Sequence, residues 1–206
     1  MSRRRQREEP PWSEYYKTTA RWPAADTLVK ALSLFDLEGS HGKACFAIDL
    51  GCGGGRDTLE LLRRNWLVLA VDNQASALRS VRTAVPAEYR SRLKIRLASF
   101  ETVRLPMCDL INGSYSLPFC RPERFDTFWR RIMVSLRSRG RLAAHLFGIR
   151  DEWANSTDMT FHVASQVKIL LSELQTEFFE EKEWNGTTAS GKRKHWHVFS
   201  IVARKA

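Results

Sequence analysis

The segment 47–62, AIDLGCGGGRDTLELL, joins a short apolar run to a glycine-rich turn and then to an amphipathic run. A continuous apolar run of this length is typical of a strand buried on both faces of a parallel sheet. Glycines such as Gly51 and Gly53 have no Cβ, so a ligand can approach their backbone closely. Leu59 and Leu62 then fall on one side of a predicted helix. The segment therefore predicts a strand, a ligand-holding turn and a helix.

The same alternation of apolar and amphipathic runs continues through the chain. The spacing of Leu28, Leu32 and Phe35 predicts a helix before the first strand, and the run LKIRL alternates as an exposed edge strand does. Alternating strands and helices form a parallel sheet with helices on both faces, and a hairpin at the end adds an antiparallel strand. The expected helices are 24–35, 56–65, 75–85, 122–140 and 159–174, and the expected strands are 43–51, 67–72, 93–100, 107–114, 141–148, 176–184 and 195–204.

The length of 206 residues fits one domain, which we place at 12–206 after a disordered basic tail at 1–11. No apolar run reaches the roughly 20 residues that a membrane helix needs, and no secretory leader opens the chain. We therefore expect no membrane association and a cytoplasmic location. The four cysteines form no CxxC pair, so we expect reduced thiols and no metal site.

The formal net charge of +10 raises the alternative of a nucleic-acid partner. Much of the positive charge lies in the tail, at Arg3, Arg4, Arg5 and Arg7, and the rest is scattered along predicted helices. No basic run is interleaved with aromatic residues that could stack on bases. Solvated surface charge is favoured over an RNA-binding surface.

Two acids frame the glycine turn. Asp72 follows it by about 20 residues, at the end of the next strand, where its carboxylate can accept hydrogen bonds from both hydroxyls of a ribose. Asp49 directly precedes the turn and would repel a pyrophosphate, but it favours a ligand with positive charge. The dinucleotide pattern G-x-G-x-x-G also fails, because its last position is Arg56. S-adenosylmethionine (SAM) meets these requirements, since it carries an ammonium, a sulfonium and a ribose but no phosphate.

The motifs DLGCGGGRDT (49–58) and VD (71–72) resemble motif I and the acidic motif II of class I SAM-dependent methyltransferases. Together with W..YY..T.R.P (12–23) and INGSYSLPF (111–119), they look most similar to the tellurite-resistance-type small-molecule methyltransferases. The resemblance implies an α/β, Rossmann-like fold. Its sheet would have seven mostly parallel strands in the order 3-2-1-4-5-7-6, with strand 7 antiparallel.

The resemblance also implies a set of cofactor-binding residues for SAM. The methionine end would lie near Asp49, Arg21, Asn112 and Gly113, and the ribose near Asp72. A serine replaces the acid that relatives often place beside the adenine amine. The implied set is Arg21, Asp49, Gly51, Cys52, Gly53, Asp72, Asn73, Ser99, Phe100, Asn112 and Gly113.

The acceptor should bind where the parallel strands end, because ligands of such sheets bind at that edge. Tyr115, His145 and Arg150 lie at or beyond strand ends, and the antiparallel strand begins there with His195 and His197. These five residues are the candidate catalytic residues, with no metal involved. The two histidines share one face of their strand, a pattern that packing alone also explains. We expect a small-molecule acceptor, whether thiol, oxyanion or amine; the alternatives are RNA and a non-catalytic SAM-binding protein.

Overall fold

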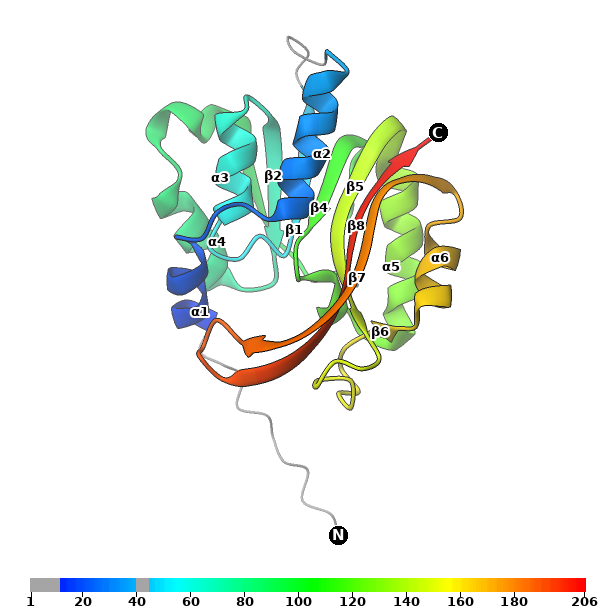
Figure 1. Cartoon of the computed structure of the whole chain (residues 1–206). Helices are drawn as coiled ribbons and strands as arrows, with labels where there is room; N and C mark the ends of the chain where they lie inside the picture. The colour runs from blue at the N-terminus through cyan, green and yellow to red at the C-terminus, as the bar shows by residue number, and fades with distance from the viewer. Residues whose placement is uncertain (1–11, 40–44) are drawn as a thin grey trace.

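The computed structural model describes residues 12–39 and 45–206, so the predicted tail at 1–11 lies outside the described residues. Its centre is a mostly parallel sheet in the order β3-β2-β1-β4-β5-β8-β7 (Figure 1). Strand β8 runs antiparallel to both β5 and β7, which confirms the predicted order and the hairpin. The strands are β1 Phe46–Leu50, β2 Leu67–Asp72, β3 Leu93–Leu97, β4 Cys108–Gly113, β5 Leu136–Gly148, β6 Phe161–His162, β7 Leu174–Thr187 and β8 Arg193–Lys205.

Helices cover both faces of the sheet, giving three layers (Figure 1). One apolar core lies between the sheet and α2, α3 and α4, and it includes the predicted Leu28, Leu32 and Phe35. The other lies between the sheet and α5 and α6, with Phe128 fully buried. The helices are α1 Trp12–Thr19, α2 Asp26–Leu37, α3 Arg56–Arg63, α4 Ala75–Ala84, α5 Pro122–Ser135 and α6 Ala164–Leu170, with 3-10 turns η1 Ala87–Arg92 and η2 Leu117–Phe119.

The predicted helix 122–140 is too long, because α5 ends at Ser135 and β5 begins at Leu136. Gly140 suggested a helix end, but it lies inside the strand. Leu136 pairs with Cys108, and Arg137 Nη1 lies 2.9 Å from Asp109 Oδ2. Pairing with β4 thus replaces the last helical turn.

The predicted helix 159–174 is also too long. Residues Phe161 and His162 form the short strand β6 beside Phe147 and Gly148, and α6 covers only 164–170. Because Phe147 is buried and half-buried Phe161 lies beside it, pairing with β5 outweighs helix formation here.

The β7–β8 hairpin curves below the edge where the parallel strands end (Figure 1). Its other end is tied to the sheet by Arg141 of β5, whose side chain is 1% exposed. Arg141 donates to Glu177 of β7 at 2.7 Å and to Glu38, just after α2, at 2.6 Å. The hairpin is therefore fixed at its base and reaches the edge of the sheet where a ligand would bind.

Candidate active site at the glycine turn

The glycine turn leaves β1 in a backbone conformation that favours glycine. The φ angles of Gly51, Gly53 and Gly55 are +66°, +51° and +88°. A Cβ on Gly51 would lie 2.4 Å from the Cβ of Ser116, whose hydroxyl donates to the Leu50 carbonyl at 2.6 Å. The turn therefore packs tightly against the segment after β4, and Gly51 needs both its conformation and its lack of a side chain.

Two buried carboxylates lie side by side beneath this turn. Asn112 Nδ2 donates to Asp49 Oδ1 at 2.9 Å and to Asp57 Oδ2 at 3.0 Å, so one amide bridges both. Thr58 Oγ1 donates to the other oxygen of Asp49 at 2.5 Å. Asp49 is 2% exposed, Asp57 is 5% exposed and Asn112 is fully buried. The end of β1, the end of β4 and the start of α3 thus build one polar cluster.

The two acids differ in the charge that they hold. Burial, with the adjacent charge of Asp57, raises the pKa of Asp49 to about 7. Burial opposes ionisation of Asp57 as well, but Arg56 and the Ala25 N–H outweigh it and lower its pKa. Arg56 Nε lies 2.9 Å from Asp57 Oδ1. One cation therefore serves two buried carboxylates, and the negative charge that ionised Asp49 would carry lacks a neutralising partner within the described residues.

Asp72 ends β2 beside the same turn. Its Oδ2 accepts from Gly53 N–H at 3.0 Å and its Oδ1 accepts from Gln74 N–H at 2.8 Å. The carboxylate is 7% exposed, and burial raises its pKa. Each oxygen keeps a free lone-pair direction after these bonds, so Asp72 can also accept from two hydroxyl groups.

Further predicted cofactor residues surround the turn. Phe100 stacks on Phe128 with ring centroids 4.8 Å apart, and its ring edge lies 3.5 Å from where a Cβ of Gly51 would be. A Cβ on Gly113 would come within 2.7 Å of Leu117, so the end of β4 has room only for glycine. Burial raises the pKa of the Cys52 thiol well above its usual value, with Asp49 and Asp72 adding to the effect, so the thiol stays neutral.

Three of the predicted residues lie farther out. Asn73 is exposed and accepts a hydrogen bond from Gln74. Ser99 Oγ lies 3.2 Å from Thr102 Oγ1. Arg21 is exposed and lines a groove of about 400 Å³ together with Arg56. Arg56, which lines the same groove, pairs with the buried carboxylate of Asp57.

On the acceptor side, the structure brings Tyr115 and His145 together. Their rings stack with centroids 4.0 Å apart and an interplanar angle of 14°. Tyr115 has a φ of +54°, a strained value for a residue with a side chain, and such strain is concentrated at functional sites. His145 is fully buried, and neither ring nitrogen makes a hydrogen bond within the described part of the chain. Nε2 lies 3.5 Å from Oδ1 of Asp26, and this contact with His145 lowers the pKa of Asp26.

An aromatic cluster continues from Tyr115 to the hairpin. Trp196 lies edge-on to Tyr115 at 6.3 Å and stacks on Trp184 at 5.8 Å. Trp153 and Phe147 complete the cluster around Lys194, whose ammonium lies 3.6 Å from the Trp196 centroid and pairs with Asp151. This face of the hairpin is therefore mainly aromatic and encloses one buried ion pair.

His195 and His197 lie on the opposite face of β8 from Trp196, as the alternation predicted, and Arg150 of the loop after β5 contacts His197. Arg150 pairs with Glu181 and Glu183 of β7. Both ring nitrogens of His197 are engaged: Nδ1 accepts from Arg150 N–H at 3.2 Å and Nε2 lies 2.9 Å from Glu181. His195 bonds Asn185 at 2.9 Å. These contacts join the loop after β5 to the hairpin.

The sequence reasoning missed four polar residues of this site: Asp26, Arg56, Asp57 and Thr58. Three of them form the segment RDT directly after the glycines, so their position in the motif could have revealed them. Asp26 begins α2 and reaches His145 only through the packing of that helix on β5, which no local pattern indicates.

Among the residues that the structure describes, no group of three or more His, Cys, Asp or Glu side chains is arranged to hold a metal ion. Cys52, Cys108 and Cys120 form no disulfide bond in the described part of the chain. No helix in the described ranges is both long and apolar enough to cross a membrane.

Comparisons with known proteins agree with this geometry. Residues 47–140 match the family model of a methyltransferase domain. A search of curated proteins finds no match. TehB from Haemophilus influenzae superimposes with a TM-score of 0.73 at 14% identity, covering 95% of this chain and 67% of that one.

Two further solved structures contain the demethylated product, S-adenosylhomocysteine (SAH). The magnesium protoporphyrin IX methyltransferase of Synechocystis has a TM-score of 0.67 at 10% identity, covering 95% of this chain and 94% of its own. The 1,6-didemethyltoxoflavin-N1-methyltransferase of Burkholderia thailandensis has a TM-score of 0.59 at 20% identity, covering 94% and 84%.

The fold is thus that of the class I SAM-dependent methyltransferases, and residues 47–140 match the model of a methyltransferase domain. This match and this fold agree with the resemblance that the motifs around Asp49 and Asp72 carry. SAM is the methyl donor of this class.

Proposed function

We propose that this chain methylates a small-molecule acceptor, bound between the glycine turn and the β7–β8 hairpin. The observation that supports the donor side is the buried pair Asp49 and Asp57, for which Arg56 is the one paired cation among the described residues. A ligand that brings an ammonium and a sulfonium supplies the missing positive charge, whereas a diphosphate would add to the repulsion.

The residues fit this donor in distinct ways. Asp49 would pair with the ammonium, and the two free acceptor directions of Asp72 suit the ribose hydroxyls. Positive φ angles at Gly51 and Gly53 expose backbone without side chains, and the edge of Phe100 lies beside that turn. When bound, SAM supplies an activated methyl group on a sulfonium.

The protein's own contribution is orientation and exclusion of water. Tyr115 would limit the space beside the donor, because its backbone strain and its stack on His145 fix the ring. Burial raises the pKa of Tyr115 to about 12, so its hydroxyl stays protonated and can donate to an acceptor oxygen or nitrogen. His145 has both ring nitrogens unbonded in the described structure, and it can accept a proton from an amine or alcohol acceptor.

We assign Arg150, His195 and His197 to positioning rather than to chemistry. The polar atoms of these three side chains are already engaged by Glu181, Glu183 and Asn185. By holding the hairpin against the loop after β5, they keep Trp196 beside Tyr115. An aromatic surface of this kind suits an acceptor with an apolar or planar part, whether its methylated atom is a thiol, an oxyanion or an amine.

Transfer of label from methyl-tritiated SAM tests the acceptor class. Thiols, selenite, tellurite and amines form one panel, and total RNA is the competing substrate. Labelled small product is the expected result. Label in RNA at low enzyme concentration would overturn the proposal in favour of an RNA methyltransferase, and SAH binding without transfer to any substrate would favour a non-catalytic role.

Calorimetry with SAH tests the donor site separately. Micromolar-range binding by the native protein is expected, together with a loss of about tenfold or more in Asp72→Ala, because hydrogen bonds to a charged group are lost. A folded native protein that releases no heat with SAH would contradict the donor site.

A further inference from the structure

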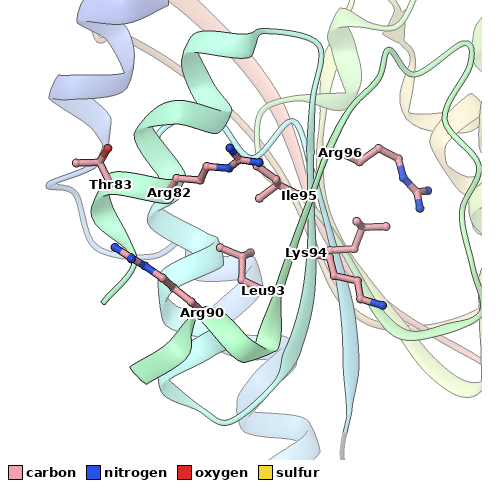
Figure 2. A pocket seen from close by; sticks show the side chains of 8 residues that line it. Arg82, Thr83, Arg90, Leu93, Lys94, Ile95 and Arg96 are labelled. Carbon is pink, nitrogen blue, oxygen red and sulfur yellow. The ribbon is translucent and has the colours of Figure 1, made fainter. Parts of the chain in front are cut away.

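A groove of about 830 Å³ lies along the outer edge of β3, away from the glycine turn (Figure 2). It is formed by β3 residues 93–96, by the last turn of α4 and by η1. Helix α4 starts at Ala75, just after the end of β2, and runs back across the sheet. Its residue Arg82 therefore lies near the opposite edge from the donor site, so this groove is separate from the methyl-transfer site.

The groove includes an open strand edge. Within the described chain, β3 pairs with β2 and with no other strand. Just after β3, the Ala98 N–H donates inward to the Asp72 carbonyl at 3.0 Å. Backbone groups alternate in direction along a strand, so the N–H and C=O of Ile95 point outward, toward the groove. An added strand could form hydrogen bonds there.

Side chains from both faces of the sheet surround this edge (Figure 2). Leu93 and Ile95 are half-buried on the side of α4, and Lys94 and Arg96 point to the other side. The edge therefore offers apolar contact on one face and positive charge on the other.

The charges of this groove are all positive. Arg82, Arg90, Lys94 and Arg96 are exposed, and none forms an ion pair with another residue in the described part of the chain. Arg96 donates to the Arg104 carbonyl and Arg90 to the Val85 carbonyl, contacts that leave most of their N–H donors available. Two cations lie on each side of the strand, so a ligand on the edge meets positive charge on both of its faces.

We propose that β3 binds an extended, acidic segment of a partner protein, which adds to the sheet as a further strand. Main-chain hydrogen bonds at an open edge supply affinity, and side chains on the two faces supply specificity. A second copy of this chain is disfavoured at the edge, because the same four cations would face one another. RNA is disfavoured because no aromatic side chain lines the groove to stack on its bases.

Fluorescence anisotropy with a labelled peptide tests this proposal. The peptide alternates Glu and Val over about six residues, the usual length of a strand. We expect saturable binding that weakens with salt, and no binding of a matched peptide with Lys in place of Glu. Oligouridine is the nucleic-acid probe. Stronger binding of oligouridine than of the acidic peptide, or no binding of either probe, would overturn the proposal.

Two variants separate strand addition from charge attraction. Ile95→Pro removes an outward N–H without removing a bond to β2, and proline is tolerated on edge strands; we expect it to weaken peptide binding at least about tenfold. Ile95→Val keeps the N–H and should bind within about twofold of the native protein. Equal peptide binding by the native protein, Ile95→Pro and Ile95→Val would exclude strand addition.

The double variant Lys94→Glu and Arg96→Glu leaves the backbone edge intact and carries the test if Ile95→Pro does not fold. It should lose peptide binding, and unchanged binding would contradict the proposed charge recognition. Far-ultraviolet circular dichroism and SAH calorimetry on each variant establish folding. Because SAH binding should be unchanged throughout, failure of this proposal is distinguishable from failure of the methyltransferase assignment.

Discussion

The Tyr115 ring stacks on the His145 imidazole at 4.0 Å, and this places a fully buried histidine, with Nε2 3.5 Å from Asp26 Oδ1, directly behind the proposed acceptor site. The two residues come from the ends of neighbouring strands, β4 and β5. A tyrosine with a positive φ costs stability, and so does a buried imidazole whose polar contact is the Asp26 carboxylate at 3.5 Å, so their joint presence suggests a function.

His145→Phe keeps the stack but removes both ring nitrogens. With an amine or alcohol acceptor, we expect kcat to fall about 10²-fold or more, because proton acceptance is lost. SAH affinity should stay within about twofold. Steady-state kinetics with the acceptor found in the labelling panel measures kcat, and calorimetry measures the affinity for SAH. If His145→Phe kept the kcat of the native protein with an amine or alcohol acceptor, proton transfer by His145 would be ruled out.

Asp49→Asn should stabilise the unliganded protein at pH 8. Burial and Asp57 raise the pKa of Asp49 to about 7 in the folded state, against about 3.9 in the unfolded chain. Between about pH 3.9 and about pH 7, Asp49 holds fewer protons in the unfolded chain than in the folded protein, so the free energy of unfolding falls as pH rises. The neutral amide of Asn avoids this loss. A gain of about 1 kcal/mol would raise the melting temperature by about 2–4 °C. A lower melting temperature of Asp49→Asn at pH 8 would contradict a destabilising buried charge at Asp49. The control variant is Asp109→Asn, because Asp109 is an aspartate that is only half-buried.

SAH affinity should depend on pH through the same residue. Above pH 7 Asp49 is ionised and can pair with the ligand ammonium, whereas below pH 7 the ligand must first displace a proton. We expect calorimetric affinity to decrease by up to about tenfold for each unit of pH below 7. In Asp49→Asn the affinity should be weak and nearly constant over the same range. A flat profile in the native protein would show that Asp49 does not pair with the ligand.

Gly51→Ala should destabilise the protein and abolish SAH binding. The new Cβ would lie 2.4 Å from Ser116 and would also occupy a backbone with φ of +66°. We expect a loss of about 1–3 kcal/mol in the free energy of unfolding, measured with urea. Gly191→Ala is a matched control, since Gly191 has a φ of +79° with no atom within 4 Å of its Cβ position. A similar loss in both variants would attribute the effect to backbone strain alone.

Arg141→Met should be severely destabilising without involving the active site. It leaves Glu38 and Glu177 facing each other without the cation that joins them. Removing one member of a buried ion pair costs about 3–5 kcal/mol. Arg204→Met is the control, because Arg204 is 21% exposed and lies 3.4 Å from Glu38. Urea unfolding of both variants checks this prediction, and equal losses would contradict it.

The sequence predicted the fold well where the determining pattern was local. Lys94 and Arg96 alternate with apolar residues, and β3 is an edge strand. Leu28, Leu32 and Phe35 share a helical face, and all three are buried. The prediction was wrong where pairing with a distant strand overrides a local signal. Gly140 has the position of a helix terminator, but the chain had already joined β4 at Leu136.

The site was predictable to the extent that it follows from one motif. Asp49, Gly51 and Asp72 are placed by the strand–turn–helix pattern, and the structure puts them around one turn. The pairing of Asp26 with His145 depends on how α2 packs on β5, and the network around Arg150 depends on the register of the hairpin. Neither packing nor register can be read from a single sequence, so these contacts required the structure.

The antiparallel position of β8 has a consequence for synthesis on the ribosome. Strand β5 has one edge beside β4, but its other edge bonds to β8, whose first residue, Arg193, is translated 45 residues after Gly148. Until then, the nascent chain exposes an apolar strand that includes Leu142 and Leu146. We expect ribosome-bound intermediates that end before β8 to recruit chaperones, and the catalytic centre to form only after translation of the last strand.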